Sequence, residues 1–331
     1  MKISQTYYAV AGTLLLSTAA LPPVWAQTTL QLINEYPATS ITAAADLQFA
    51  AEVQAQSGGD LKIETLQEKN NPYKGGDQVD AISQGKTQMG TLFGGVLGNK
   101  DSLFLLSSLP FAAKDFAQAK ALYTCAKPAL EARVKALGAQ LLYVTPWPPS
   151  GIWSVKPLAD DADAKALKIR TYDATSKSVF ERLGAQSVQL PYSALAEKLA
   201  AGDVNAVLTS GDGGAGRSLW DHLPNFTAVS YSIPLSYTII NDQAWSKLSP
   251  AQQTIMTKAA DKVSEASWAG VEQRIDANYT RMREHKMTLN TAPSDAIMTA
   301  LKKAGADETK AWLEENKLAD KDAACLLKTG T

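Results

Sequence analysis

A single stretch near the C-terminal end, residues 249–286, constrains the fold more than any other part of the sequence. It keeps an amphipathic pattern throughout and contains no proline after Pro250. Ser249 and Pro250 are typical of the cap and the first position of a helix. At about 1.5 Å per residue, a helix of this extent would be roughly 57 Å long, more than the width of one domain. The stretch therefore predicts one helix that runs across two lobes.

The part of the chain before this helix shows the same rhythm twice. Short strands alternate with helices in both halves, and the strands are expected at residues 30–36, 61–67, 88–93, 167–172, 187–190 and 204–208. Such alternation is typical of parallel-rich α/β sheets. Two details are also expected: a pair of helices within residues 115–137, interrupted near Pro128, and a glycine loop at residues 211–216.

The chain crosses between these halves near residues 147–152 and again through residues 227–241, which are strand-like. Two lobes joined by several segments form a hinged cleft, and a ligand is expected there at the carboxyl ends of the strands. The predicted fold is therefore a two-lobed α/β fold with one long helix spanning both lobes. We expect the first lobe to comprise residues 27–147 and 236–275, and the second residues 148–235 and 276–331.

The N-terminus, residues 1–26, has the pattern of a secretory signal peptide. Lys2 provides a positive start, residues 9–21 are apolar, and Val24 and Ala26 occupy the −3 and −1 positions of a cleavage site. The apolar stretch is shorter than the about 20 residues that a membrane span needs. We therefore expect a periplasmic protein that is not embedded in the membrane.

The sequence contains two cysteines, Cys125 and Cys325. An even count in an oxidising compartment favours one disulfide, which would tie the C-terminal tail to the helix near residue 125. The alternative is a pair of buried free thiols.

The charged residues exclude several classes of protein. Lys and Arg number 32 against 33 Asp and Glu, a net charge of −1, whereas a nucleic-acid-binding protein carries a basic face. Two histidines and two cysteines leave few ligands for a soft metal, and we predict no cofactor and no metal site. Residues 84–87 (QGKT) look like the end of a phosphate-binding loop. That motif requires glycine five residues before Gly85, where this sequence has Asp80, so the motif fails. The GxGxxG pattern at residues 211–216 lacks room for the long helix that a dinucleotide site requires.

Arg170 is the strongest candidate for a binding residue. It lies in a predicted strand with apolar neighbours, shortly after the first crossing between the lobes. A planar guanidinium in a partly dry cleft can bind a carboxylate through two parallel hydrogen bonds. The alternative is an ordinary arginine on the edge of a strand.

An ordered set of motifs resembles the DctP-like solute-receptor family of tripartite ATP-independent periplasmic (TRAP) transporters. The set consists of LKIR at 167–170, FERLGA at 180–185, PYS at 191–193 and AAGDVNA at 200–206, preceded by QGKTQM at 84–89 and LPF at 109–111. The resemblance implies the periplasmic binding protein fold and a receptor that closes on a small organic acid and delivers it to TRAP membrane permease subunits. It also implies that Arg170 grips the substrate carboxylate.

The sequence departs from this family where an asparagine usually follows about forty residues after the arginine. Thr209, Ser210 and Gly211 stand there instead, and their hydroxyl and backbone groups would donate hydrogen bonds to the ligand. Aromatic residues at strand ends and near the first crossing are expected to contact the rest of the ligand; they are Tyr36, Phe93, Trp147 and Tyr172. This set predicts an apolar-bodied monocarboxylate, either aromatic or a short hydroxy or keto acid, although Lys74 and Arg217 could supply a second charge.

Two other functions remain open from the sequence. The chain could be an exported hydrolase that uses Ser210, Asp212 and His222, because a hydroxyl nucleophile needs a nearby base. It could also be a receptor that senses its ligand without transporting it. We predict a binding protein and no enzymatic activity.

Overall fold

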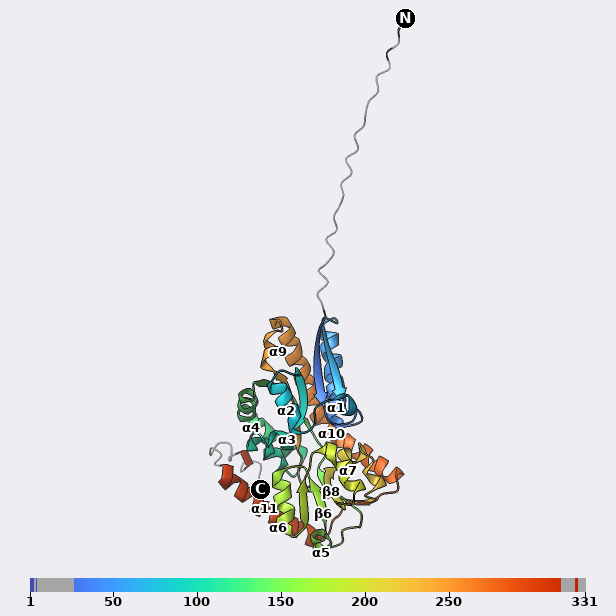
Figure 1. Cartoon of the computed structure of the whole chain (residues 1–331), viewed down its shortest axis with the longest axis vertical. Coiled ribbons are helices and arrows are strands. Elements are labelled where there is room, and N and C mark those ends of the chain that lie inside the picture. The colour runs from blue at the N-terminus through green and yellow to red at the C-terminus, as the bar shows by residue number, and fades with distance from the viewer. Residues whose placement is uncertain (3, 5–26, 317–324, 327–331) are drawn as a thin grey trace.

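Two β-sheets organise the chain, one in each of two lobes (Figure 1). The structure is a computed structural model that describes residues 1, 2, 4, 27–316, 325 and 326. The predicted signal peptide, residues 1–26, lies almost entirely outside the described residues. Within the described part of the chain, no helix is long and apolar enough to cross a bilayer.

The first lobe, at the top of Figure 1, is built on a five-stranded sheet with the order β2-β1-β3-β10-β4. Strand β10 runs antiparallel to both of its neighbours, and the other strands share one direction. The strands are β1 (Thr28–Asn34), β2 (Leu61–Gln67), β3 (Met89–Phe93), β4 (Ala139–Pro146) and β10 (Leu235–Asn241). The helices are α1 (Ile41–Gln56), α2 (Gly76–Ser83), α3 (Gly94–Leu97), α4 (Phe116–Ala136) and α9 (Asp242–Ser246), with 3-10 turns η1 (Glu68–Asn70) and η2 (Ser102–Ser108).

The second lobe is built on a six-stranded sheet with the order β11-β9-β5-β8-β6-β7. Strand β5 runs antiparallel to β8 and β9, so each crossing between lobes delivers one antiparallel strand. The strands are β5 (Ser150–Ser154), β6 (Lys168–Thr171), β7 (Gln186–Gln189), β8 (Ala206–Ser210), β9 (Asn225–Thr227) and β11 (Thr288–Asn290). The helices are α5 (Asp161–Lys165), α6 (Ala174–Leu183), α7 (Leu195–Ala200), α8 (Gly211–Ala215) and α11 (Asp295–Asn316), with 3-10 turns η3 (Tyr192–Ala194) and η4 (Leu219–Asp221).

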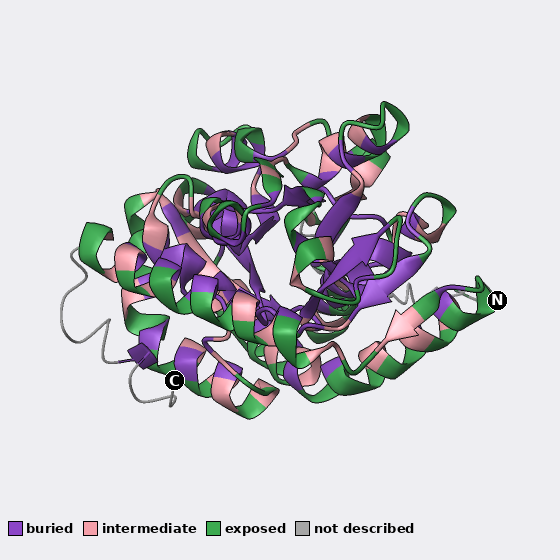
Figure 2. Ribbon diagram, turned by 90° about the horizontal axis from the view of Figure 1, so that it is seen from below, coloured by how far each residue is buried: buried purple, intermediate pink, exposed green. Residues whose placement is uncertain are grey.

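Helix α10 (Pro250–Glu284) connects the two lobes, as the sequence predicts. The side chains of Ser249 and Gln252 form a capping box at its start. Met256 and Val263 pack into the core of the first lobe, whereas Met282 packs into the core of the second. Figure 2 shows buried residues concentrated in the strands, while the surrounding helices expose one face to solvent. Burial of one face along its whole length therefore fixes α10 against both sheets.

The expected pair of helices at residues 115–137 is wrong, because α4 continues through Pro128 as one helix. A proline inside a helix removes one backbone hydrogen bond and is costly. The buried face of α4, formed by Leu122, Ala126, Leu130 and Val134, packs into the core and offsets that cost. The predicted disulfide between Cys125 and Cys325 is confirmed, and it ties the C-terminal tail to this helix.

The strand-like stretch at 227–241 is also divided differently from the prediction. Strand β9 ends at Thr227 and β10 begins only at Leu235. The intervening residues form the second crossing and pair with the first, since Ser150 N donates to Ser232 O at 2.9 Å and Tyr231 N donates to Ser150 O at 2.8 Å. Pro234 has no N–H to donate to a sheet, which explains why the strand begins after it.

Candidate functional site

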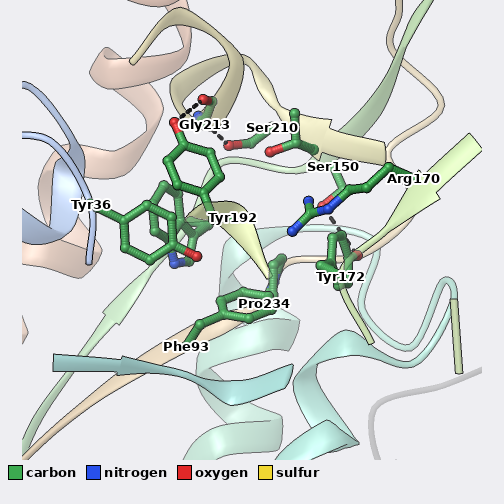
Figure 3. A pocket seen from close by; sticks show the side chains of 11 residues that line it. Tyr36, Phe93, Ser150, Arg170, Tyr172, Tyr192, Ser210, Gly213 and Pro234 are labelled. Carbon is green, nitrogen blue, oxygen red and sulfur yellow. Dashed lines mark hydrogen bonds between the residues drawn. The ribbon is translucent and has the colours of Figure 1, made fainter. Parts of the chain in front are cut away.

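A cavity lies between the lobes where strands from both sheets end (Figure 3). Its empty volume is about 330 Å³, a figure that includes space open to solvent at its mouth. Strands β1 and β3 bring residues from the first lobe, and β6 and β8 bring residues from the second. The residues that line it are Tyr36, Phe93, Trp147, Ser150, Arg170, Tyr172, Tyr192, Thr209, Ser210, Gly213 and Pro234.

Arg170 is the cation on the wall of this cavity. It is only 3% exposed, and its Nε and Nη2 atoms donate to the carbonyl oxygen of Leu190 at 2.9 and 2.6 Å. Burial lowers the pKa of Arg170, but an arginine keeps its charge in proteins. Among the described residues, Nη1 makes no hydrogen bond, and Figure 3 shows the guanidinium directed into the cavity. The fixed fork therefore presents donors to an anion.

Hydroxyl groups surround Arg170 on the wall of the second lobe. The Tyr172 hydroxyl donates to Ser150 Oγ at 3.2 Å and lies 2.8 Å from Ser232 Oγ. Ser210 Oγ accepts from the N–H of Gly213 at 3.1 Å, which caps α8. Because Ser150 and Ser210 act as acceptors in these contacts, their own O–H groups remain available to donate to a ligand. This wall can therefore bind a carboxylate through charge and several hydrogen bonds.

Aromatic rings form the opposite side of the cavity. The ring centre of Tyr36 lies 4.7 Å from that of Trp147 and 4.7 Å from that of Tyr192. Phe93 meets Tyr172 edge to face at 5.3 Å, and Trp147 Nε1 donates to Ser236 Oγ at 2.9 Å. Figure 3 shows the Tyr36 hydroxyl pointing into the same space as Arg170. Such rings provide flat apolar contact area for the body of a small ligand.

A second layer of charges lies beside the cavity. Glu35 is 2% exposed and accepts the N–H of Gly75 at 3.1 Å. Burial raises the pKa of Glu35, whereas the Gly75 N–H and the charges of Arg170, Lys74 and Arg217 act to lower it. Lys74 and Arg217 do not line the cavity, and both contact other groups.

Arg217 lies 4.3 Å above the ring centre of Tyr192, and its Nη1 is 3.6 Å from Glu68 Oε1. The Nζ of Lys74 donates to the carbonyl oxygen of Glu68. The idea that Lys74 or Arg217 supplies a second charge to the ligand is therefore not supported, because neither lines the cavity.

The structure brings most of the expected binding residues together on the cavity wall: Tyr36, Phe93, Trp147, Arg170, Tyr172, Thr209 and Ser210. Gly211 does not line the cavity and Gly213 does, because the expected glycine loop is instead the buried helix α8. A Cβ on Gly213 would lie 2.3 Å from Thr209 Oγ1, and one on Gly214 would lie 2.0 Å from the ring of Trp153. These glycines serve close packing and not a flexible loop.

The sequence reasoning missed Ser150, Tyr192 and Pro234. Two signals could have found the first two. Ser150 follows the prolines of the first crossing and begins a strand, and Tyr192 follows Pro191 within a motif that the family resemblance had already drawn attention to. In the described part of the chain, no cluster of three or more His, Cys, Asp or Glu residues could hold a metal ion.

Comparison with known proteins gives one family. The family model of the bacterial extracellular solute-binding proteins of family 7 (DctP) matches residues 34–316. Solved structures of the same fold cover about nine tenths of this chain, and the two described next are among three receptors for the same compound.

The first of these is DctP7 from Bordetella pertussis, an extracytoplasmic solute receptor binding pyroglutamic acid. It is 26% identical with a TM-score of 0.85, and the match covers 91% of this chain and 99% of that one. The second is a TRAP solute-binding protein from a marine metagenome, specific for pyroglutamate. It is 27% identical with a TM-score of 0.85, covering 92% and 98% of the two chains.

A more distant structure is similar in fold. It is a TRAP periplasmic solute-binding protein from Sulfitobacter sp. NAS-14.1 with bound β-D-galacturonate, 16% identical with a TM-score of 0.81, and the match covers 90% of this chain and 98% of that one.

Proposed function

The chain belongs to the bacterial extracellular solute-binding proteins of family 7, the solute receptors of TRAP transporters, and we propose that its pocket captures a small cyclic monocarboxylate of the pyroglutamate type. One observation carries this proposal. A buried arginine, held by the carbonyl of Leu190, directs its remaining donors into a small cavity whose other side is aromatic.

The chemistry of pyroglutamate fits the groups on the two walls. Its carboxylate would pair with Arg170 and accept hydrogen bonds from Ser150 or Ser210. Its flat five-membered ring would lie against Tyr36 and Trp147, and its lactam carbonyl could accept a hydrogen bond from a remaining hydroxyl. Thr209 and the Tyr36 hydroxyl are the available donors on the wall.

The test is a ligand screen on residues 27–331 by thermal shift and calorimetry, with pyroglutamate, proline, lactate, pyruvate and aromatic monocarboxylates. A ligand that binds only the folded state raises the melting temperature by mass action. Loss of one charged, hydrogen-bonded contact in Arg170→Ala should weaken binding about 10- to 100-fold in a protein that remains folded. The matched control is Arg133→Ala, an arginine at a surface ion pair.

Two outcomes would contradict the proposal. If no acid in the screen shifts the melting temperature of the folded protein, the pocket takes a different kind of ligand. If Arg170→Ala binds the best ligand as tightly as the native protein, Arg170 does not hold the carboxylate.

Capture would proceed by closure of the two lobes about the crossings. We take the moving bodies to be residues 27–147 with 236–275, and residues 148–235 with 276–331. Closure draws on contacts that only the closed state makes with the ligand, which shifts the population toward it. The closed receptor then delivers its solute to TRAP permease subunits. The alternative of a receptor that only senses its ligand predicts no uptake in cells that carry the permease, which a radiolabelled uptake assay distinguishes.

The pocket supports binding and not catalysis. Ser210 Oγ caps α8, and Asp212 accepts hydrogen bonds from Ile41 N, Arg274 and Asn278. His222 does not line the cavity, so the described lining provides no base for a serine nucleophile. We therefore propose a receptor without enzymatic activity, and we expect pyroglutamate to be recovered unchanged after incubation with the protein.

The family indicates where the protein is located, because its members are extracellular solute-binding proteins. We further propose that residues 1–26 are removed on export and that the mature protein begins at Gln27 in the periplasm. Mass spectrometry of the periplasmic fraction would identify the first residue, and recovery of the uncleaved chain from membranes would contradict this.

A further inference from the structure

We propose that Glu35 restricts the pocket to ligands that carry a single negative charge, by cancelling part of the positive charge around Arg170. This inference rests on the proposed function, since it takes the ligand carboxylate to bind Arg170. It assigns a specificity-determining role to a residue that does not itself line the cavity.

A continuous path of contacts connects Glu35 to Arg170 across the two lobes. Glu35 Oε2 accepts the N–H of Gly75 at 3.1 Å. Gly75 lies beside the ring of Pro191, since a Cβ added to this glycine would lie 3.4 Å from the Pro191 Cβ. Pro191 follows Leu190, whose carbonyl oxygen receives both hydrogen bonds from Arg170. The carboxylate and the guanidinium therefore lie behind neighbouring parts of the cavity wall. Burial raises the pKa of Glu35, and the charge of Arg170 acts to lower it.

Glu35 also supports the aromatic side of the cavity. It directly precedes Tyr36, whose ring contacts Trp147 and Tyr192 at centre distances of 4.7 Å. Burial raises the pKa of the Tyr36 hydroxyl and the charge of Glu35 acts in the same direction, so the carboxylate also influences the aromatic side of the pocket.

The charges around the cavity leave room for one anion. The charged groups in this region are the cations Arg170, Arg217 and Lys74 and the carboxylates Glu35 and Glu68. Asp212 is paired with Arg274. Asp173 adds a third carboxylate, hydrogen-bonded at the N-terminus of α6, and burial raises its pKa. Of all these charged groups only Arg170 lines the cavity, so a single ligand carboxylate has a single cation to pair with.

A second ligand carboxylate would find no cation in the cavity lining. Arg217 and Lys74 lie outside that lining, where Arg217 Nη1 is 3.6 Å from Glu68 Oε1 and Lys74 Nζ donates to the carbonyl oxygen of Glu68. An unpaired charge in a closed, poorly hydrated cleft is costly, and a nearby carboxylate adds repulsion. Removing the charge of Glu35 should relieve that repulsion for any anion, and twice as strongly for a dianion.

The experiment compares two probes of almost identical shape, glutaramate and glutarate, which differ by an amide in place of one carboxylate. Each is used to displace pyroglutamate from the native protein and from Glu35→Gln, with the affinities measured by calorimetry. We expect the native protein to bind glutarate at least about tenfold more weakly than glutaramate. In Glu35→Gln, the ratio of the glutaramate affinity to the glutarate affinity should be smaller by a factor of at least about five. This variant should also bind pyroglutamate at least about three times more tightly than the native protein does.

Two further variants serve as controls. Glu35→Asp keeps the charge and should keep the discrimination between the two probes. Glu272→Gln removes the charge of an exposed residue on α10 and should leave all affinities unchanged.

The outcomes separate this proposal from the proposed function. A native protein that binds no monocarboxylate contradicts the proposed function before any variant is made. A native protein that binds pyroglutamate but takes glutarate as tightly as glutaramate overturns the role of Glu35, even if Glu35→Gln fails to fold. If neither probe displaces pyroglutamate, the test is the pyroglutamate affinity of Glu35→Gln compared with that of the native protein. Unchanged or weaker binding by the folded variant overturns the proposal, and tighter binding supports it.

Discussion

The two walls of the pocket differ in what they present and in how they are held. The wall from the second lobe carries Arg170 and the hydroxyl groups of Ser150, Thr209 and Ser210. The wall from the first lobe carries the rings of Tyr36 and Phe93, with Trp147 at the crossing. The charged group of the pocket therefore lies on the second lobe, whereas its aromatic rings come from both lobes, Tyr172 and Tyr192 from the second. A ligand that contacts Arg170 and the first-lobe rings together would need the lobes closed, which would couple binding to closure.

The supports behind these walls differ as well. In the second lobe, the backbone carbonyl of Leu190 fixes the arginine directly. In the first lobe, Asn34 Oδ1 accepts the N–H of Tyr36 at 2.9 Å, and Asn34 Nδ2 donates to the buried carboxylate of Asp46 at 2.6 Å. Arg170 on the polar wall thus relies on one backbone acceptor, whereas Tyr36 on the apolar wall relies on a buried polar network.

The largest expected effect is a loss of stability on replacing Asp212, which joins the two lobes. Asp212, in the second lobe, accepts from the N–H of Ile41 at the start of α1 at 2.9 Å, and also from Arg274 and Asn278 on α10. Asp212→Ala leaves these donors without their acceptor and should lower the free energy of unfolding by about 3–4 kcal/mol. Urea unfolding measures this.

Asp212→Asn is the matched control, because its amide oxygen can still accept from Ile41 while its N–H₂ group faces other donors. It should fall between the native protein and Asp212→Ala. An alanine variant as stable as the native protein would show that this contact does not hold the lobes together.

The next prediction concerns Asp46, whose carboxylate belongs to the polar network behind the apolar wall, and its effect on stability at different pH values. Burial raises the pKa of Asp46 to about 6, against hydrogen bonds from Thr91, Asn34 and Tyr143 that act to lower it. The folded state therefore holds a proton between about pH 4 and pH 6 that the unfolded chain has released. Stability from this group is present at low pH and is lost as the pH rises.

The test compares the native protein with Asp46→Asn, which cannot ionise. The stability of the native protein relative to this variant should fall by about 2 kcal/mol between pH 4 and pH 7, as a shift from 3.8 to about 6 implies. Exposed Asp60→Asn should show no such trend. A difference independent of pH would mean that Asp46 titrates normally.

A third prediction separates charge from geometry on the polar wall. Arg170→Lys keeps a positive charge but loses the planar fork that bonds Leu190 and the ligand at once. Pyroglutamate binding should weaken about tenfold, less than in Arg170→Ala, as calorimetry would show. If Arg170→Lys and Arg170→Ala lose the same amount of pyroglutamate affinity, the positive charge alone does not contribute to binding and the planar geometry of the guanidinium is required.

The sequence predicts the long helix and the strand ends because local signals specify them. Ser249 and Pro250 cap α10, and no later proline interrupts it. Arg170, Tyr36 and Phe93 lie on the cavity wall because strand ends in such sheets meet at one edge. Their contact with a ligand stays a prediction.

Tertiary packing decides the features that the sequence did not reveal. Glycine-rich residues 211–215 have poor helix propensity, yet Ser210 caps them and the ring of Trp153 leaves no room for a side chain at Gly214. Helix α4 continues through Pro128 because its buried face belongs to the core. Pro234 reaches the cavity through the geometry of the second crossing, which no local pattern specifies, whereas Ser150 and Tyr192 each follow prolines that could have marked them.

The smallest effect is expected from a single hydroxyl on the apolar wall. Tyr36→Phe keeps the ring that contacts Trp147 and Tyr192 and removes only the group that points into the cavity. A neutral hydrogen bond contributes about 0.5–1.5 kcal/mol, so pyroglutamate affinity should fall about two- to tenfold. A monocarboxylate without the lactam group, such as cyclopentanecarboxylate, should bind both proteins equally. If both ligands lose affinity alike, the hydroxyl supports the ring and does not contact the lactam; if neither loses affinity, the apolar wall recognises shape alone.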